Sequence, residues 1–169
     1  MANPDIKIGK VTLNIGVGDS GDKLQKAEKL LTVLTGQKPL RTFGKKTISE
    51  WGVRKFAPIG VKVTLRHKKA ADFLGKAFEA IEHKVKPGQF DSRGNLSFGI
   101  REYIELPQSK YDPDIGMFGF DLSVNLERSG YRVTRRAIRP AKIPKKAIIT
   151  PEESAKFFEQ NFKVKVVTE

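Results

Sequence analysis

The sequence contains no cysteine and only two histidines among its 169 residues. A chain without thiols cannot form disulfide bonds, thiolate zinc sites or cysteine nucleophiles, and two imidazoles leave little scope for other metal chemistry. It also lacks a run of about 18 apolar residues, the length that a membrane-spanning helix requires. The N-terminal stretch MANPDIKIGK has no apolar signal-peptide segment. We therefore expect a soluble intracellular protein with no metal and no cofactor.

Acidic residues are also scarce. The chain has 19 Asp and Glu against 32 Lys and Arg, a net charge of +13 and a pI near 10.0. A charge of this size favours an anionic partner. Because 38% of the residues are hydrophobic, a chain of this length can bury one core, and we expect a single domain over residues 1–169.

The basic residues are clustered rather than spread evenly. Residues 38–69 hold ten Lys and Arg and a single acid, Glu50, whereas residues 101–131 hold three basic and six acidic residues. Residues 132–146 are basic without any acid and are interrupted by proline, which predicts a basic arm at about 130–147. The arm cations are Arg132, Arg135, Arg136, Arg139, Lys142, Lys145 and Lys146. Clustering favours phosphate neutralisation, with a solvated lysine-rich face as the alternative.

Apolar and polar residues alternate in four segments, which predicts half-buried strands. The segments are 10–15, 61–66, 96–106 and 118–126. In the third, the alternation places Ile104 in the apolar row and Tyr103 in the polar row. Strands buried on both faces would be apolar throughout, so the pattern indicates a mostly antiparallel sheet with one covered face.

Helical spacing of apolar residues predicts three helices to cover that face. The first follows Ser20, a candidate N-cap, and ends at Gly36; the second spans about 69–85; the third starts after Thr150, and KVKVV near the end predicts a short strand. The expected fold is α+β, a mostly antiparallel sheet with helices on one face and the other face free for RNA. The free face carries hydroxyls, amides and bases.

A glycine pattern between a strand and a helix needs separate consideration. Gly16-Val17-Gly18-Asp19-Ser20-Gly21 fits G-x-G-x-x-G, but the ribose-binding acid expected about 20 residues later is absent. The further parallel units of a dinucleotide-binding sheet are absent as well. A dinucleotide-binding enzyme is therefore the minor alternative, and we find no catalytic triad or carboxylate dyad that would support it.

The stretch from Arg41 to Gly60 joins two predicted strands and mixes cations with aromatics. Its cations include Lys45, Lys46, Arg54 and Lys55, and its aromatics are Phe43, Trp51 and Phe56. This composition is typical of a surface that grips phosphates and stacks on bases. The alternative for Trp51 and Phe56 is that they anchor the loop to the core.

Several strings occur together and in order: KVTLNIGVG, LTGQKPLRT, a basic loop ending in PIGVKVTLR, and FDSRGNLSFGIRE. Over most of residues 7–128 the chain thereby resembles the universal ribosomal protein L5 family of the large subunit. The stretch ITPEESAKFFEQNF resembles the closing helix of that family. The start of the chain and the inserted arm are similar to the archaeal and eukaryotic branch.

The resemblance implies an α+β protein of the cytoplasmic ribosome that helps attach 5S rRNA in the central protuberance, beside large-subunit rRNA. It also implies a bridge to the small-subunit protein S-thirteen and a contact with peptidyl-site tRNA. The implied 5S rRNA contacts are Asn14, Gln37 and Thr64, and we add the neighbouring Lys10, Thr12, Lys62 and Arg66. The implied tRNA-facing loop holds Lys45, Lys46, Thr47, Arg54 and Lys55. We expect the acidic segment 101–131 to face the basic bridge partner.

Overall fold

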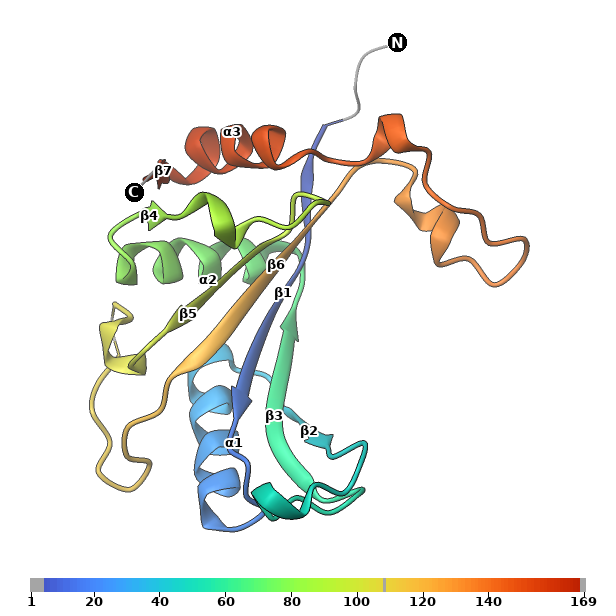
Figure 1. Ribbon diagram of the computed structural model, residues 1–169. Helices are drawn as coiled ribbons and strands as arrows, with labels where there is room; N and C mark the ends of the chain where they lie inside the picture. Colours follow the sequence, from blue (N-terminus) through green and yellow to red (C-terminus); the bar gives the residue numbers. More distant parts are fainter. Residues whose placement is uncertain (1–4, 108, 168–169) are drawn as a thin grey trace. The chain divides into compact units, whose positions relative to one another are not determined.

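A computed structural model describes residues 5–107 and 109–167, without the side chain of Lys146 (Figure 1). The helices are α1 (Asp22–Thr35), α2 (His67–Ala80) and α3 (Pro151–Phe162). The strands are β1 (Lys7–Gly16), β2 (Leu40–Phe43), β3 (Pro58–Leu65), β4 (Lys84–Val85), β5 (Leu96–Ile100), β6 (Phe120–Glu127) and β7 (Lys165–Val166). None of the described helices has the length and apolar character needed to cross a membrane.

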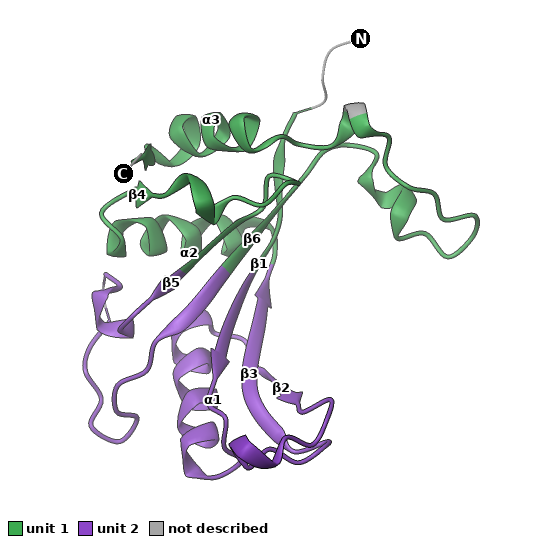
Figure 2. Ribbon diagram, viewed as in Figure 1, with its two compact units in different colours: residues 1–11, 66–98, 123–169 green, residues 12–65, 99–122 purple. Residues whose placement is uncertain are grey.

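The strands form a five-stranded, mostly antiparallel sheet in the order β2-β3-β1-β6-β5. A separate pair, β4 and β7, is parallel. The expected α+β fold is confirmed. Contacts divide the chain into two compact units (Figure 2): unit 1 is residues 1–11, 66–98 and 123–169, and unit 2 is residues 12–65 and 99–122. The single domain expected from the sequence stays a prediction.

The predicted alternation is present in the strands. Val11, Leu13 and Ile15 of β1 are buried, whereas Thr12 and Asn14 between them are half-buried. The same pattern holds along β3, β5 and β6, because each pleated strand turns successive side chains to opposite faces.

In unit 2, α1 packs against β3 with its buried row of Leu24, Ala27, Leu30 and Leu31. The N-cap predicted at Ser20 is wrong. The cap residue is Gly21, which has no side chain to offer, and the Ser20 backbone N–H donates to Asp19 Oδ1 at 2.7 Å. The predicted end is confirmed, since Gly36 adopts the left-handed conformation with φ 62°.

In unit 1, Phe78 of α2 joins the helices to the sheet. Its ring stacks on Phe98 of β5 with centroids 5.6 Å apart and meets the edge of Phe158 from α3 at 5.7 Å. The second helix ends at Ala80, earlier than predicted. Glu82 and His83 have φ of 54° and 56°, which an α-helix cannot contain.

The predicted third helix is confirmed with its cap. Thr150 Oγ1 accepts from the Glu153 backbone N–H at 3.3 Å, and the Glu153 carboxylate accepts from the Thr150 N–H at 3.1 Å. This capping box satisfies two backbone donors of the first turn. The predicted closing strand is β7.

Two segments differ from the sequence prediction. The strand expected over 96–106 ends at Ile100, and a short 3-10 helix follows at Tyr103–Glu105. The alternation of buried and exposed side chains predicted from a continuous strand therefore does not hold in this turn. Tyr103 is therefore only 2% exposed, and its hydroxyl accepts from the Asp112 N–H at 3.0 Å. The stretch 41–60 is also not an irregular loop, because β2 begins it and pairs with β3.

Candidate nucleic-acid interface

On strands β1 and β3 of unit 2, the polar row opposite the buried side chains carries four of the residues predicted to contact 5S rRNA. Lys62 and Thr64 of β3 are exposed, and Thr12 and Asn14 of β1 are half-buried. Asn14 lies in a shallow recess of about 510 Å³ whose lining also includes Arg101 and Asp121. Such a recess offers an amide, a guanidinium and a carboxylate to a polar ligand.

Gln37 of unit 2 follows the left-handed turn that ends α1. Its backbone N–H donates to Thr35 Oγ1 at 3.3 Å, which fixes the residue after the helix. Within the described residues its half-buried side-chain amide makes no hydrogen bond, so it can serve a ligand. Nearby, Arg41 of β2 is already engaged: its hydrogen bonds lower the pKa of the Glu28 carboxyl below its usual value.

The residues from 43 to 57 form a nested turn that we call the basic hairpin. The Gly44 N–H donates to the Ala57 carbonyl at 2.9 Å, and Ile48 and Val53 exchange backbone hydrogen bonds of 2.8 and 3.1 Å. Thr47, predicted to face tRNA, has its hydroxyl oxygen engaged by the Lys55 N–H at 3.1 Å. The hairpin therefore presents its cations from a hydrogen-bonded frame.

The aromatic residues of the hairpin do not anchor it to the core, so that alternative is wrong for them. Trp51 and Phe56 are both 72% exposed, and Phe43 is also exposed. The buried residues of the hairpin are Gly44 and Val53. The Lys55 ammonium lies 5.0 Å from the Phe56 ring centroid. Exposed rings beside cations can stack on nucleobases.

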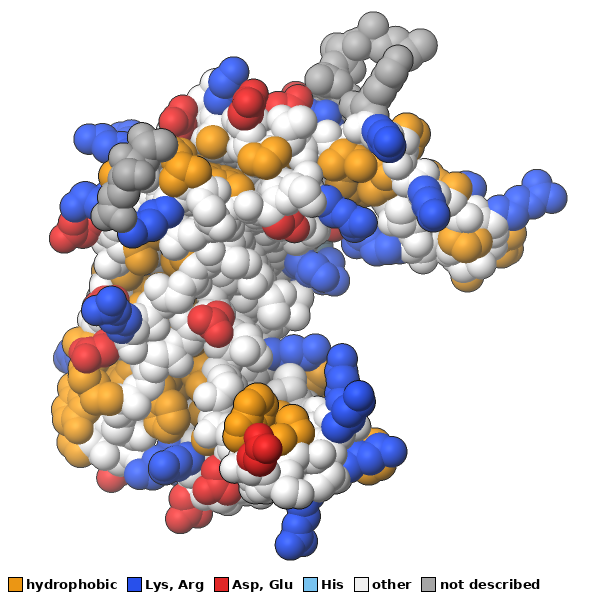
Figure 3. All heavy atoms as spheres, in the orientation of Figure 1, with side chains coloured by type: hydrophobic (Ala, Val, Ile, Leu, Met, Phe, Trp, Pro, Cys, Tyr) orange, Lys and Arg blue, Asp and Glu red, His pale blue; other side chains and the backbone are white. Residues whose placement is uncertain are grey.

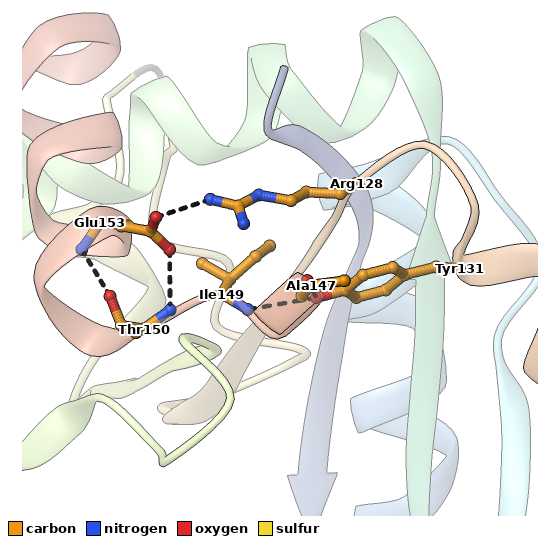
Figure 4. Close-up of polar contacts among 6 residues, drawn as sticks. All are labelled: Arg128, Tyr131, Ala147, Ile149, Thr150 and Glu153. Carbon is orange, nitrogen blue, oxygen red and sulfur yellow. Dashed lines mark hydrogen bonds and ion pairs between the residues drawn. The ribbon is translucent and has the colours of Figure 1, made fainter. Parts of the chain in front are cut away.

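The basic arm of unit 1 is closed at its base by polar contacts (Figure 4). The Tyr131 hydroxyl donates to the Ala147 carbonyl at 2.9 Å and accepts from the Ile149 N–H at 3.2 Å. Beside it, Arg128 reaches Glu153 at 2.8 Å. The two ends of the arm are thereby held together although they are 16 residues apart.

The predicted arm cations whose side chains are described are exposed, and Lys and Arg side chains gather over the arm in Figure 3. Only Arg135 is in an ion pair among those whose side chains are described; its partner is Glu127 of β6. Arg132, Arg136, Arg139, Lys142 and Lys145 have no acidic partner within the described chain. The side chain of Lys146 lies outside the described part.

Unit 1 also holds Lys10, exposed on β1, and Arg66, exposed just before α2. Sequence reasoning did not assign a role to Asn95, Asn125 and Arg93, which lie near Lys10 around a second recess. Asn125 belongs to the polar row of a predicted strand, which was the available signal. No sequence pattern brings Asn95 beside it, since the two residues are 30 positions apart.

The acidic segment 101–131 has Asp112 and Asp114 of unit 2 on its surface. The Asp114 N–H donates to Asp112 Oδ1 at 3.0 Å, a side-chain-to-backbone hydrogen bond typical of turns. An apolar groove of about 430 Å³ lies beside these residues, lined in part by Val33 and Tyr111.

Within the described residues, no group of three or more acids and histidines could hold a metal ion.

The glycine pattern at residues 16–21 is accounted for by the fold. The N–H groups of Val17 and Gly18 both donate to the Ile59 carbonyl, at 3.0 and 2.8 Å, so they do not point to a phosphate. Gly18 has φ 77°, which glycine adopts without strain.

Two family profiles match successive parts of the chain. The one described as "Ribosomal protein L5" matches residues 3–54, and the one that describes the C-terminus of the same ribosomal family matches residues 58–157. The chain belongs to the ribosomal protein L5 family. Membership in the L5 family makes it a structural constituent of the ribosome and not an enzyme, so the dinucleotide-binding alternative is dropped.

Individual relatives agree with this assignment along nearly the whole chain. A protein of Sulfurisphaera tokodaii is 52% identical over 163 residues, which cover 96% of this chain and 92% of the relative. Relatives from Methanosphaera stadtmanae and Methanobrevibacter smithii are 48% and 47% identical, covering 94% and 98% of this chain and 95% and 97% of their own lengths. Each is named large ribosomal subunit protein uL5. These L5 relatives are archaeal, which confirms the branch expected from the sequence.

Proposed function

We propose that this L5-family chain binds 5S rRNA and helps attach it to large-subunit rRNA in the central protuberance. The observation that carries the proposal is the set of exposed cations on the basic arm and at Lys10, Lys62 and Arg66. Apart from Arg135, those with described side chains have no acidic partner within the described chain. A cation without a protein partner can neutralise a phosphate and release its counterion at no cost in broken ion pairs.

The 5S rRNA contacts in this proposal are polar side chains of both units. Asn14, Gln37 and Thr64 of unit 2 fix register by hydrogen bonds. The further contacts are Thr12 and Lys62 of unit 2 and Lys10 and Arg66 of unit 1. In this arrangement the cations hold the phosphate backbone and the neutral polar groups orient it.

Salt titration of binding to a 5S rRNA fragment tests the electrostatic part. The logarithm of the affinity should fall with the logarithm of salt concentration with a slope of about −3 or steeper, because each neutralised phosphate contributes about 0.7–0.9. Absent or salt-insensitive binding contradicts the proposal.

Alanine variants test the polar row. Asn14→Ala and Thr64→Ala should each weaken 5S rRNA binding about fivefold, the value of one hydrogen bond of about 1 kcal/mol. Thr32→Ala is the matched control, because Thr32 lies on α1 and its hydroxyl donates to the Glu28 carbonyl at 2.8 Å. Normal binding by both polar-row variants, with the control also normal, places 5S rRNA on another surface.

The basic hairpin faces peptidyl-site tRNA in this proposal, because its exposed rings and cations suit an RNA that is contacted transiently. Replacing Lys45, Lys46 and Arg54 together by alanine should spare 5S rRNA binding and weaken tRNA binding to reconstituted subunits. A large loss of 5S rRNA affinity would place the hairpin on rRNA instead.

The acidic segment 101–131 faces the small-subunit protein S-thirteen in this proposal. Its exposed carboxylates and the groove beside Tyr111 offer charge and apolar area to a basic protein. Replacing Asp112 and Asp114 by lysine should weaken association with S-thirteen and leave 5S rRNA binding unchanged. Equal association of the variant and the unaltered chain would remove this assignment.

A further inference from the structure

Unit 1 contains a recess of about 620 Å³ between the polar row of β6, the turn before β5 and the basic arm. Its volume lies within the range of about 300–1,000 Å³ typical of small-ligand sites. Apolar side chains contribute part of the lining, because Ile143 and Ile148 are half-buried there. The recess thus has apolar surface for a flat group.

Two amides in the recess are held in a defined orientation. Asn95 Nδ2 donates to Asp91 Oδ2 at 2.8 Å, so Asn95 Oδ1 is turned toward Asn125, whose Nδ2 donates to it at 2.8 Å. Although burial favours the protonated acid, hydrogen bonds from Asn95 and Arg93 hold the pKa of Asp91 below its usual value, so Asp91 stays an acceptor. Because the Asp91 carboxylate can only accept, the orientation of both amides follows.

Asn125 then has one acceptor and one donor to spare. Within the described residues its Oδ1 accepts no hydrogen bond, and its Nδ2 uses one of two protons. An amide that offers one acceptor and one donor side by side matches the N6 and N7 edge of adenine.

The arm is tied across the recess by one ion pair. Glu127 of β6 pairs with Arg135 of the arm. The Glu127 side chain lies over Gly9 of β1, where any Cβ would collide with it. Glycine at this position therefore leaves the space that Glu127 needs to reach Arg135.

The charge around the recess favours an anion. Lys10 and Lys142 line it without an acidic partner within the described residues, Arg93 lines it with its charge partly offset by Asp91, and Glu127, the acid in the lining, is paired with Arg135. An acidic peptide would satisfy these cations but would make no use of a fixed amide edge over apolar side chains. A nucleotide uses all three features, with the base inside and the phosphate at the cations.

We propose that this recess receives one unpaired nucleotide of RNA, with adenine preferred. The inference rests on the proposed RNA binding and adds a base-reading site to it. Asn125 reads the base edge, Ile143 and Ile148 contact the base, and Lys10, Arg93 and Lys142 hold the phosphates on either side.

The test uses hairpin RNAs that differ at a single bulged position, with the full chain as the binding protein. The bulge carries adenine, uracil or an abasic sugar, and a fully paired hairpin serves as reference. Because a bidentate amide contact with one base is worth roughly tenfold in affinity, the adenine bulge should bind about tenfold more tightly than the abasic one. The hairpin with a bulged uracil should bind with an affinity between those of the adenine and abasic hairpins.

Variants separate base reading from general attraction. Asn125→Asp should abolish the preference for adenine over uracil, and Gly9→Ala should reduce it by displacing Glu127 from Arg135. Lys142→Ala should weaken all bulged hairpins while keeping the preference. Lys145→Ala is its matched control, since it removes the same charge from the arm outside the recess; circular dichroism verifies that each variant is folded.

The outcomes distinguish this proposal from the proposed function. Salt-dependent binding to the 5S rRNA fragment together with equal affinity for adenine and abasic bulges overturns the recess alone. Displacement of the adenine hairpin by polyglutamate as readily as by competitor RNA also overturns it, in favour of an acidic peptide. If the chain binds none of the RNAs, the recess and the proposed function fall together.

Discussion

The ion pair between Arg128 and Glu153 permits a prediction that combines structure and pH. Arg128 is 7% exposed, and its Nε atom is buried without a hydrogen bond within the described residues, so Glu153 is the main compensation for its charge. Glu153→Gln removes the negative charge but keeps an oxygen that can still accept from the Thr150 N–H. The substitution therefore isolates the charged part of the contact.

The magnitude follows from the geometry. A hydrogen bond to a charged group contributes about 1.5–3 kcal/mol. The Glu153 side chain is 36% exposed, so solvent screens part of this interaction. We expect Glu153→Gln to lower the free energy of unfolding at pH 7 by about 1–2 kcal/mol. For a chain of this size that corresponds to about 2–8 °C in Tm.

The pH dependence has a defined sign. The hydrogen bond from the Thr150 backbone, followed by that from Arg128, holds the pKa of Glu153 below its ordinary value of 4.5. The stabilisation is therefore complete above about pH 4.5 and is lost as the pH falls through the folded-state pKa. The unaltered chain and the variant should differ most at pH 7, and the difference should be smaller at pH 3, below the ordinary pKa of the carboxyl.

Urea unfolding followed by circular dichroism at both pH values measures this difference. Glu152→Gln is the matched control, because Glu152 is exposed in the same helical turn and has no ion pair within the described residues. The reasoning is refuted if Glu153→Gln is as stable as the unaltered chain at pH 7. It is equally refuted if the difference between the two proteins is the same at both pH values.

Three further substitutions and one control, Gly88→Ala, probe the packing, each by urea unfolding. Phe78→Ala should cost about 3–5 kcal/mol, because the ring is fully buried between the sheet and α3; a smaller loss would mean that the rings around it close the cavity. Gly60→Ala should cost about 1–3 kcal/mol, since its Cβ would come within 2.8 Å of the Ile15 carbonyl, whereas Gly88→Ala meets nothing within 4 Å and should not destabilise. Trp51→Ala should change stability by less than about 0.5 kcal/mol because the ring is exposed, and a larger loss would show that it packs on the hairpin after all.

The sequence predicted the elements whose pattern is local. Strand β1 was identifiable because its alternation places Val11 and Leu13 on the buried face without help from distant residues. The cap of α3 was identifiable because Thr150, Pro151 and Glu153 are within one turn of each other. The charge clusters were also visible, since exposure is the default state of Lys and Arg.

Features that depend on distant contacts were not predictable. Tyr103 is buried because a 3-10 turn replaces the expected strand, and its hydroxyl finds a partner nine residues away. The exposure of Trp51 could not be read from its type, because a large aromatic residue suits a core anchor and a stacking surface equally. Asn95 and Asn125 meet only because β5 and β6 are neighbours in the sheet.

The construction of the basic arm explains why its cations are suited to RNA. If the arm moved freely, ordering its backbone on binding would cost about 1–2 kcal/mol of free energy for each residue, because conformational entropy is lost. Tyr131 ties the two ends of this arm together, and Arg135 is fixed on Glu127, so part of that cost is already met in the folded chain. The tether uses one arginine of the arm and leaves Arg132 and Arg139 without acidic partners among the described residues. Holding the arm and binding phosphate are thus assigned to different side chains, which is why a strongly basic arm can be ordered without neutralising itself.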